Sequence, residues 1–180
     1  MKKNISKIRV YLVWVILLLI CVHGKAQDTL EMYAILELTA RQMKTDQMIY
    51  YADRVNTGDI DRIKKALRSE DLFDVNDKRV ELTENEKKFL LSELDKCKKN
   101  VWTQNFFDNS RMFPLDSLKK GKPDHCYSAF TRPIFFRDDE ACLFYHMYTC
   151  GTTSGYDAAL IYRWQRSGWA KWIKLTGGKM

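Results

Sequence analysis

The sequence contains few prolines and no low-complexity tract or internal repeat. Three of its 180 residues are proline, whereas 13% are aromatic and 46% are hydrophobic. This composition excludes a largely disordered chain, because the chain has enough apolar surface to bury a core. The longest apolar run, Val10 to Val22, has 13 residues, and a membrane-spanning helix needs about 20. The sequence therefore predicts a globular protein without a membrane span.

Residues that commonly carry catalysis or bind metals are also scarce. Of the three histidines, only His125 and His146 follow residue 26. The chain contains no glycine-rich phosphate loop and no metal-binding motif with the usual spacing of cysteines and histidines. We therefore expect no metal and no cofactor, and the sequence indicates no substrate.

The N-terminus has the layout of a secretory signal peptide. Basic residues precede the apolar run, and small residues stand three and one before an expected cut after Ala26. We expect residues 1–26 to be a signal peptide and residues 27–180 to form a single domain, exported to the periplasm or beyond the cell. A lipoprotein acylated at Cys21 is one alternative, but that signal has a small residue before the cysteine, where this chain has Ile20. An uncleaved anchor is the other.

Cleavage would also remove most of the net charge. The whole chain has 30 basic and 23 acidic residues, a net charge of +7. Five of the basic residues and none of the acids lie in residues 1–26, which leaves 25 against 23 and a net charge of +2. Binding to nucleic acid needs a concentrated basic face. The sequence therefore predicts no nucleic-acid partner.

Helical spacing of apolar residues dominates the first half of the expected domain. We expect helices over residues 29–43 and 59–69. Another helix begins near Thr83, because Thr83 and Glu86 have the spacing of a capping box. Residues 48–55 fit a short strand, although a helix that continues from the first one is an alternative.

From Cys126 onward the pattern changes to strands separated by turn signals. The expected strands cover residues 126–136, 141–150, 157–164 and 169–175. Short connections of this kind indicate antiparallel neighbours. The sequence therefore predicts an α+β fold, with N-terminal helices packed on one face of a C-terminal four-stranded antiparallel β-meander.

Cys142, His146 and Cys150 are evenly spaced in the second expected strand. A strand rises about 3.3 Å per residue, which places the two cysteines about 26 Å apart. Ligand bonds to a metal are only about 2 Å long. These three residues therefore do not form a metal site.

The four cysteines after residue 26 permit three disulfide pairings in an exported protein. If the first hairpin turns between its two aspartates, the numbers of facing residues add to 277, which brings Cys126 within one residue of facing Cys150. An irregularity at Pro133 would place them directly opposite each other. We expect this disulfide, and a second one from Cys97 to Cys142 that joins the helices to the sheet. Buried thiols are the alternative.

The tryptophans are the best indication of a binding surface. A turn at residues 166–167 would set Trp164 opposite Trp169 in the last hairpin. We expect Trp172, Arg163 and Lys174 to share an exposed face of the sheet and to bind an unknown protein or a glycan. If the other face is exposed, it presents the tryptophan pair with Tyr162 and Lys171 instead. The alternative is that aromatic residues around Phe106 and Phe107 cover these side chains.

Two functions follow from these patterns. The first is a non-catalytic binding or interaction module of the cell envelope. The alternative is a small envelope hydrolase in which folding brings an acid to His125 or His146, although neither histidine has a catalytic partner at a recognisable spacing.

Several short motifs occur in a fixed order along the chain. They are Leu82-Thr83-x-x-Glu86, Trp102 followed by Asn105-Phe106-Phe107, Arg132-Pro133-Ile134-Phe135, Phe144-Tyr145-His146-Met147-Tyr148-x-Cys150-Gly151, and Gly168-Trp169-x-x-Trp172. This arrangement resembles small uncharacterised secreted proteins of Bacteroidetes-type bacteria. Those proteins often carry a second Cys-Gly after the first, where this chain has Thr152-Thr153-Ser154-Gly155. The resemblance implies an envelope location and no activity.

Overall fold

The computed structural model describes most of the chain after residue 32. The described residues are 33–35, 37–39, 48–69, 71–103, 105–107, 109–120, 126–150 and 154–179. The expected signal peptide lies outside them. Within these ranges, no helix combines the length and the apolar character that a membrane crossing requires.

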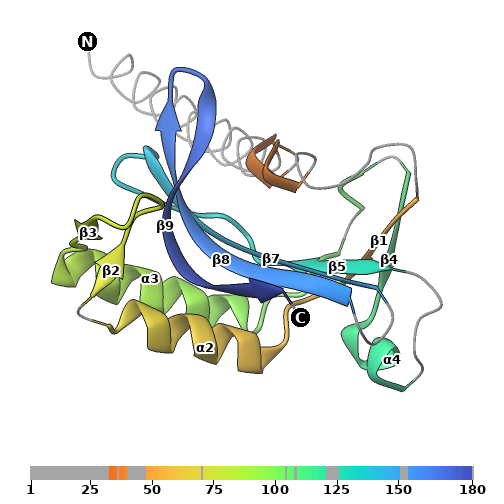
Figure 1. Cartoon of the computed structure of the whole chain (residues 1–180). Coiled ribbons are helices and arrows are strands. Elements are labelled where there is room, and N and C mark those ends of the chain that lie inside the picture. Colours follow the sequence, from red (N-terminus) through yellow and green to blue (C-terminus); the bar gives the residue numbers. More distant parts are fainter. Residues whose placement is uncertain are drawn as a thin grey trace, which may run out of the picture.

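The described part of the chain is built around a mixed sheet of seven strands (Figure 1). Its strands are β1 (Ile49–Ala52), β4 (Ser110–Phe113), β5 (Tyr127–Phe130), β6 (Ile134–Phe136), β7 (Ala141–Cys150), β8 (Ser154–Gln165) and β9 (Gly168–Lys179). The order across the sheet is β4-β1-β5-β7-β8-β9, and β6 also pairs with β7. A second, two-stranded sheet is formed by β2 (Leu72–Phe73) and β3 (Arg79–Val80).

The named helices are short, and local capping explains where two of them begin. They are α2 (Thr57–Leu67), α3 (Glu84–Cys97) and α4 (Leu115–Lys120), and residues 33–35 and 37–39 are also helical. The Asn56 side chain accepts the N–H of Gly58 at the start of α2. At the start of α3, Thr83 and Glu86 each accept the backbone N–H of the other, which confirms the expected capping box.

The expected four-stranded meander was wrong. The sheet has seven strands and is mixed, because β1 runs parallel to both β4 and β5. Parallel strands need a long crossover connection rather than a tight turn. The strand expected within residues 48–55 is present as β1, but nothing local in it indicates its partners. The sequence pattern identified pairing only between strands that follow one another through short turns.

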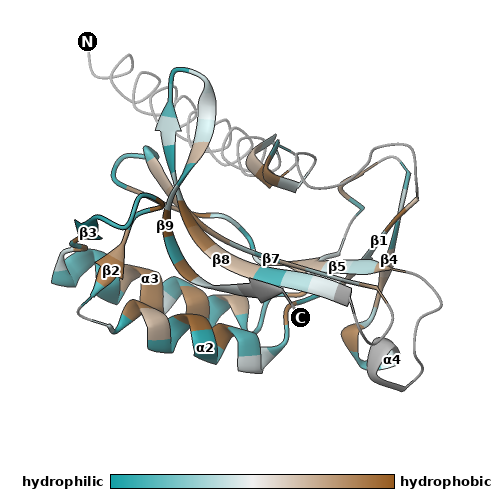
Figure 2. Cartoon of the chain, viewed as in Figure 1, coloured by the Kyte–Doolittle hydropathy of each residue, from teal (hydrophilic) through white to brown (hydrophobic). Residues whose placement is uncertain are grey.

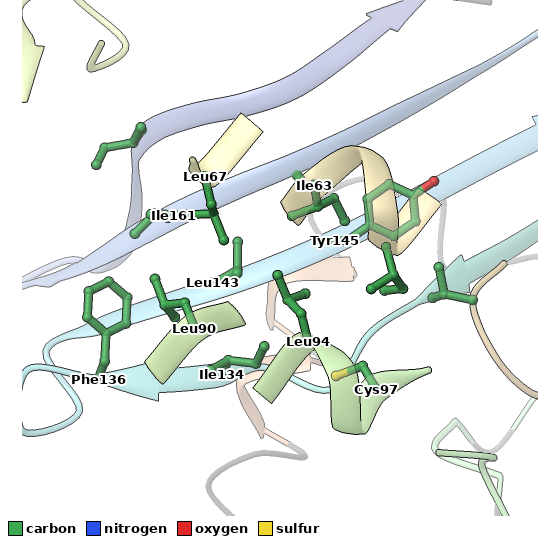
Figure 3. Close-up of a cluster of buried hydrophobic side chains, with 14 of the residues drawn as sticks. Ile63, Leu67, Leu90, Leu94, Cys97, Ile134, Phe136, Leu143, Tyr145 and Ile161 are labelled. Atoms are coloured by element: carbon green, nitrogen blue, oxygen red, sulfur yellow. The ribbon is translucent and has the colours of Figure 1, made fainter. Parts of the chain in front are cut away.

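The sheet separates two apolar clusters, because alternate side chains of a strand point to opposite faces. On one face, Leu143 and Tyr145 of β7 pack with Leu90 and Leu94 of α3 (Figure 3), and residues of α2 complete this helix-side cluster. Apolar and polar residues alternate along both helices (Figure 2). On the other face, Phe144 lies in an aromatic-side cluster. The other buried members of this cluster are Ile35, Leu38, Tyr51, Trp102, Phe130, Cys142, Leu160, Tyr162 and Trp169.

The expected disulfide between Cys126 and Cys150 is confirmed. Along β6, facing residues add to 277, as in the pair Phe136 and Ala141. Along β5 they add to 276, as in Tyr127 and Thr149. The change of one residue falls between the two strands, in the segment that contains Pro133. It brings Cys126 directly opposite Cys150, with their Cα atoms 4.1 Å apart.

The expected disulfide between Cys97 and Cys142 was wrong. Cys97 belongs to the helix-side cluster and Cys142 to the aromatic-side cluster. The sheet therefore lies between the two sulfur atoms. Both residues are buried thiols, and the S–H of Cys142 donates to the carbonyl of Leu143.

Candidate functional site

His146 lies in the middle of β7 and is sealed inside the molecule. The residue is 3% exposed, and Ser128 of β5 beside it is 1% exposed. The Nε2 atom of His146 lies 3.2 Å from the hydroxyl of Ser128. Its Nδ1 atom lies 2.9 Å from the hydroxyl of Tyr156 on β8. Phe130 and Phe144 contact the ring from the same face of the sheet.

This arrangement does not suit the alternative hydrolase. Burial lowers the pKa of the His146 imidazole to about 4, whereas a general base works best with a pKa near the working pH. Burial also raises the pKa of the Tyr156 hydroxyl. A nucleophile at Ser128 would have no access to a substrate at 1% exposure. The second candidate, His125, lies outside the described residues.

We expect the burial of His146 to make the stability of the protein depend on pH. Its pKa rises from about 4 in the folded protein to 6.5 when the chain unfolds, so the unfolded state binds more protons between these values. Stability is therefore complete above pH 6.5 and declines as the pH falls to 4, by on the order of 3 kcal/mol. Urea unfolding between pH 8 and 4 measures this loss.

The matched control for this experiment is His146→Gln, which keeps a polar group but does not titrate. Between pH 6.5 and 4, its free energy of unfolding should change less with pH than that of the wild type. Glu86 changes the stability at lower pH, because a hydrogen bond from Arg137 holds its pKa at about 2, below the ordinary 4.5. Equal slopes for the variant and the wild type would show that His146 is not the responsible group.

The structure divides the three residues that were expected to bind a ligand. Trp172 packs against the helix-side cluster, and Arg163 lies beside it, with its guanidinium carbon 5.7 Å from the centre of the indole ring. Lys174 faces Leu160, a member of the aromatic-side cluster. Trp172 and Lys174 therefore lie on opposite faces of β9, although two residues apart in a regular strand share a face.

A β-bulge in β9 explains this division. Ile161 pairs with Ile173, but the next residue, Tyr162, pairs with Lys171, so that Trp172 is the extra residue. One inserted residue reverses the alternation of side chains beyond it. As a consequence, Lys171 and Lys174 lie on the same face even though they are three positions apart.

Trp172 is already held by neighbours within the protein. The guanidinium carbons of Arg137 and Arg163 lie 4.8 Å and 5.7 Å from the centre of its ring. Arg137 also forms an ion pair with Glu86 of α3. This stack connects α3 to the sheet, so the contacts of Trp172 are those of a structural residue.

Trp164 and Trp169 face each other across the last hairpin, as the sequence predicted, with ring centres 5.2 Å apart. Trp164 is 53% exposed, whereas Trp169 is 6% exposed. The aromatic segment that was considered as a cover contributes Trp102 and Phe106, and both pack against Phe130 instead.

A hollow of about 460 Å³ lies beside β8 and β9, and we call it the β8–β9 hollow. It is lined by Phe73, Asp74, Val75, Asp77, Ala158, Leu160, Lys171 and Lys174. Its volume is in the range of small-molecule sites, about 300–1,000 Å³. The turn between β2 and β3 forms one wall. It is fixed to β9 by the N–H of Val75, which donates to the carbonyl of Trp172 at 2.9 Å.

Comparisons with family models, curated proteins and solved structures gave no match. The function of the chain therefore has to be argued from its own geometry. Among the described residues, no group of three or more histidine, cysteine, aspartate or glutamate side chains is arranged to hold a metal ion.

Sequence reasoning missed most of the β8–β9 hollow. Of the residues that line it, Lys174 was a candidate and Lys171 belonged to the alternative exposed face. Phe73 and Val75 lie in a short hairpin with no marked strand pattern, which meets β9 through the isolated bridge between Asp74 and Ile173 and the hydrogen bond from Val75 to Trp172. An available signal was the pair of apolar residues flanking Asp74, next to the turn residues Asn76 and Asp77.

Proposed function

We propose that this protein is a non-catalytic binding module of the cell envelope that holds its ligand in the β8–β9 hollow. The observation that carries the proposal is the hollow itself. It is an open concave site with an apolar floor and a few charged groups, which is the usual composition of a small-molecule site.

The lining of the hollow favours binding over catalysis. It contains lysine and aspartate but no histidine, cysteine or serine, the residues that most often act as nucleophile or general base. His146, the titratable residue with hydroxyl groups beside both ring nitrogens, is buried elsewhere in the sheet. A ligand in the hollow would therefore be held rather than transformed.

Two observations support an envelope location. The first is the signal-peptide pattern of residues 1–26, together with the resemblance to small secreted proteins of Bacteroidetes-type bacteria. The second is the disulfide between Cys126 and Cys150, because disulfides persist mainly in oxidising compartments outside the cytoplasm. The protein or glycan partner that the sequence predicted stays a prediction.

A binding screen by nuclear magnetic resonance tests the proposal. The panel contains oligosaccharides, aliphatic alcohols and aliphatic carboxylates, and amide shifts are recorded for the whole chain. We expect shifts grouped at β9 and at the β2–β3 turn. Val75→Trp should fill the hollow and weaken binding at least tenfold, because Val75 is a wall residue that is 50% exposed.

The control for this variant is Val101→Trp, at a position that is 42% exposed and not part of the hollow. It should bind as the wild type does. Shifts that group around His146, or equal losses in the two variants, would contradict a site in the hollow.

A further inference from the structure

The bulge in β9 gives the β8–β9 hollow a pair of cationic groups. Lys171 faces Tyr162 and Lys174 faces Leu160 across the strands, on the same side of the sheet. Both lysines are exposed. Neither forms an ion pair with a described residue, whereas Lys64 of α2 and Lys87 and Lys96 of α3 each do.

The side chain of Lys174 occupies space that is open because residue 177 is glycine. A Cβ atom at Gly177 would lie 3.1 Å from Cε of Lys174 and 3.0 Å from the carbonyl oxygen of Asp157. The φ angle of Gly177 is +153°, which side chains rarely tolerate. The absence of a side chain at this position therefore lets the stem of Lys174 lie along the strand beside Ala158.

One of the two acidic residues of the hollow, Asp74, is hydrogen-bonded to the backbone of the β2–β3 turn. One carboxylate oxygen of Asp74 accepts the backbone N–H groups of Asn76, at 2.8 Å, and Lys78, at 2.9 Å. These bonds lower the pKa of Asp74. Asp77 stands in the same turn with a φ angle of 60°. Asp74 thus shapes the wall, while the two lysines keep their charges available to a ligand.

The remaining surface of the hollow is apolar. Leu160 and Ala158 form the floor on β8, and Leu160 is 6% exposed. Phe73 and Val75 stand above it and are 46% and 50% exposed. Large apolar side chains at such exposure are stabilised when a ligand covers them, by about 25 cal/mol per Å² of apolar area removed from water.

We infer that the hollow takes an amphipathic anion, an aliphatic chain that ends in a carboxylate. This inference rests on the proposed function. The chain covers Leu160 and Ala158 between Phe73 and Val75, and the carboxylate accepts hydrogen bonds from the ammonium groups of Lys171 and Lys174. Bonds between two charged groups are stronger than neutral ones. A small inorganic anion alone would leave the apolar walls exposed.

Calorimetric titration of the chain with sodium decanoate, below its micelle concentration, tests this inference. Decanol supplies the same chain without charge, and acetate and phosphate supply charge without the chain. We expect decanoate to bind at least tenfold more tightly than decanol, and acetate and phosphate not to bind measurably.

The matched variants separate charge from fold. Lys171→Met with Lys174→Met keeps the apolar stems and should weaken decanoate at least tenfold while leaving decanol unchanged. Lys65→Met with Lys88→Met removes two exposed charges from α2 and α3 and should change neither. Equal binding of decanoate and decanol would overturn the anion inference and leave the proposed binding site intact. If no member of the panel shifted residues of the hollow, both would be overturned.

Discussion

Phe130→Ala lowers the free energy of unfolding by about 3–5 kcal/mol, the largest loss that we expect from a single substitution. Phe130 is 1% exposed and is the centre of the aromatic-side cluster. Its ring centre lies between 5.5 and 6.5 Å from those of Tyr51, Trp102, Phe106, Phe107, Phe144 and His146. Truncation leaves a cavity that so many rings from separate segments cannot fill. Urea unfolding followed by tryptophan fluorescence measures the loss.

The matched control is Phe89→Ala on α3. The same atoms are removed there, but Phe89 is 44% exposed, so the expected loss is below about 1 kcal/mol. Similar losses at the two positions would show that the aromatic-side cluster does not stabilise the fold as the packing indicates.

Replacement of both Cys126 and Cys150 by alanine should cost about 3–4 kcal/mol. The two cysteines are 24 positions apart, and a crosslink that closes a loop of this size restricts the unfolded chain by about that free energy. The disulfide also joins Cys126, which immediately precedes β5, to Cys150, the last residue of β7. Unfolding in urea, with and without a reductant, measures its contribution.

Reduction supplies an internal control for this prediction. The reductant should bring the wild-type protein to the stability of the double variant and should leave the variant unchanged, because Cys97 and Cys142 are thiols in both. A loss on reduction that persists in the variant would show that a different disulfide is responsible.

A charged cluster between α2 and the sheet, of which only Asp157 is buried, was not visible in the sequence. Arg62 of α2 forms ion pairs with Asp59, at 3.1 Å, and with Asp157 of β8. Asp157 is 7% exposed, and burial raises the pKa of Asp59. The cluster fixes α2 against the strand that also carries the floor of the hollow. A charge at position 157 is tolerated inside the protein only because α2 supplies its partner.

The parts of the fold that depend on near neighbours in the chain were predictable. The capping box at Thr83 and the apolar positions of α2 rest on contacts within one or two helical turns. The facing of Trp164 and Trp169 depends on a two-residue turn. The pairing of Cys126 with Cys150 required only the position of one turn and one irregularity near Pro133.

The candidate site could not be predicted in the same way, because register shifts within β9 decide which side chains share its faces. Regular alternation of side chains along β9 would place Trp172 and Lys174 on the same face, and the bulge puts them on opposite faces. Nothing in the sequence near Trp172 marks that bulge. The contacts that hold it come from Arg137 and from the turn that contains Val75.

The sequence by itself determined where α3 begins, which two cysteines form the disulfide and that the last strands are antiparallel neighbours. Each of these follows from forces that act over a few residues or across one tight turn. Only the tertiary structure decided that β1 joins the sheet by parallel pairing, that Cys97 and Cys142 lie on opposite faces, and that Lys171 and Lys174 share a hollow with Phe73 and Val75. Those outcomes depend on the packing of segments distant in the chain, and packing free energy is gained only when all of them come together.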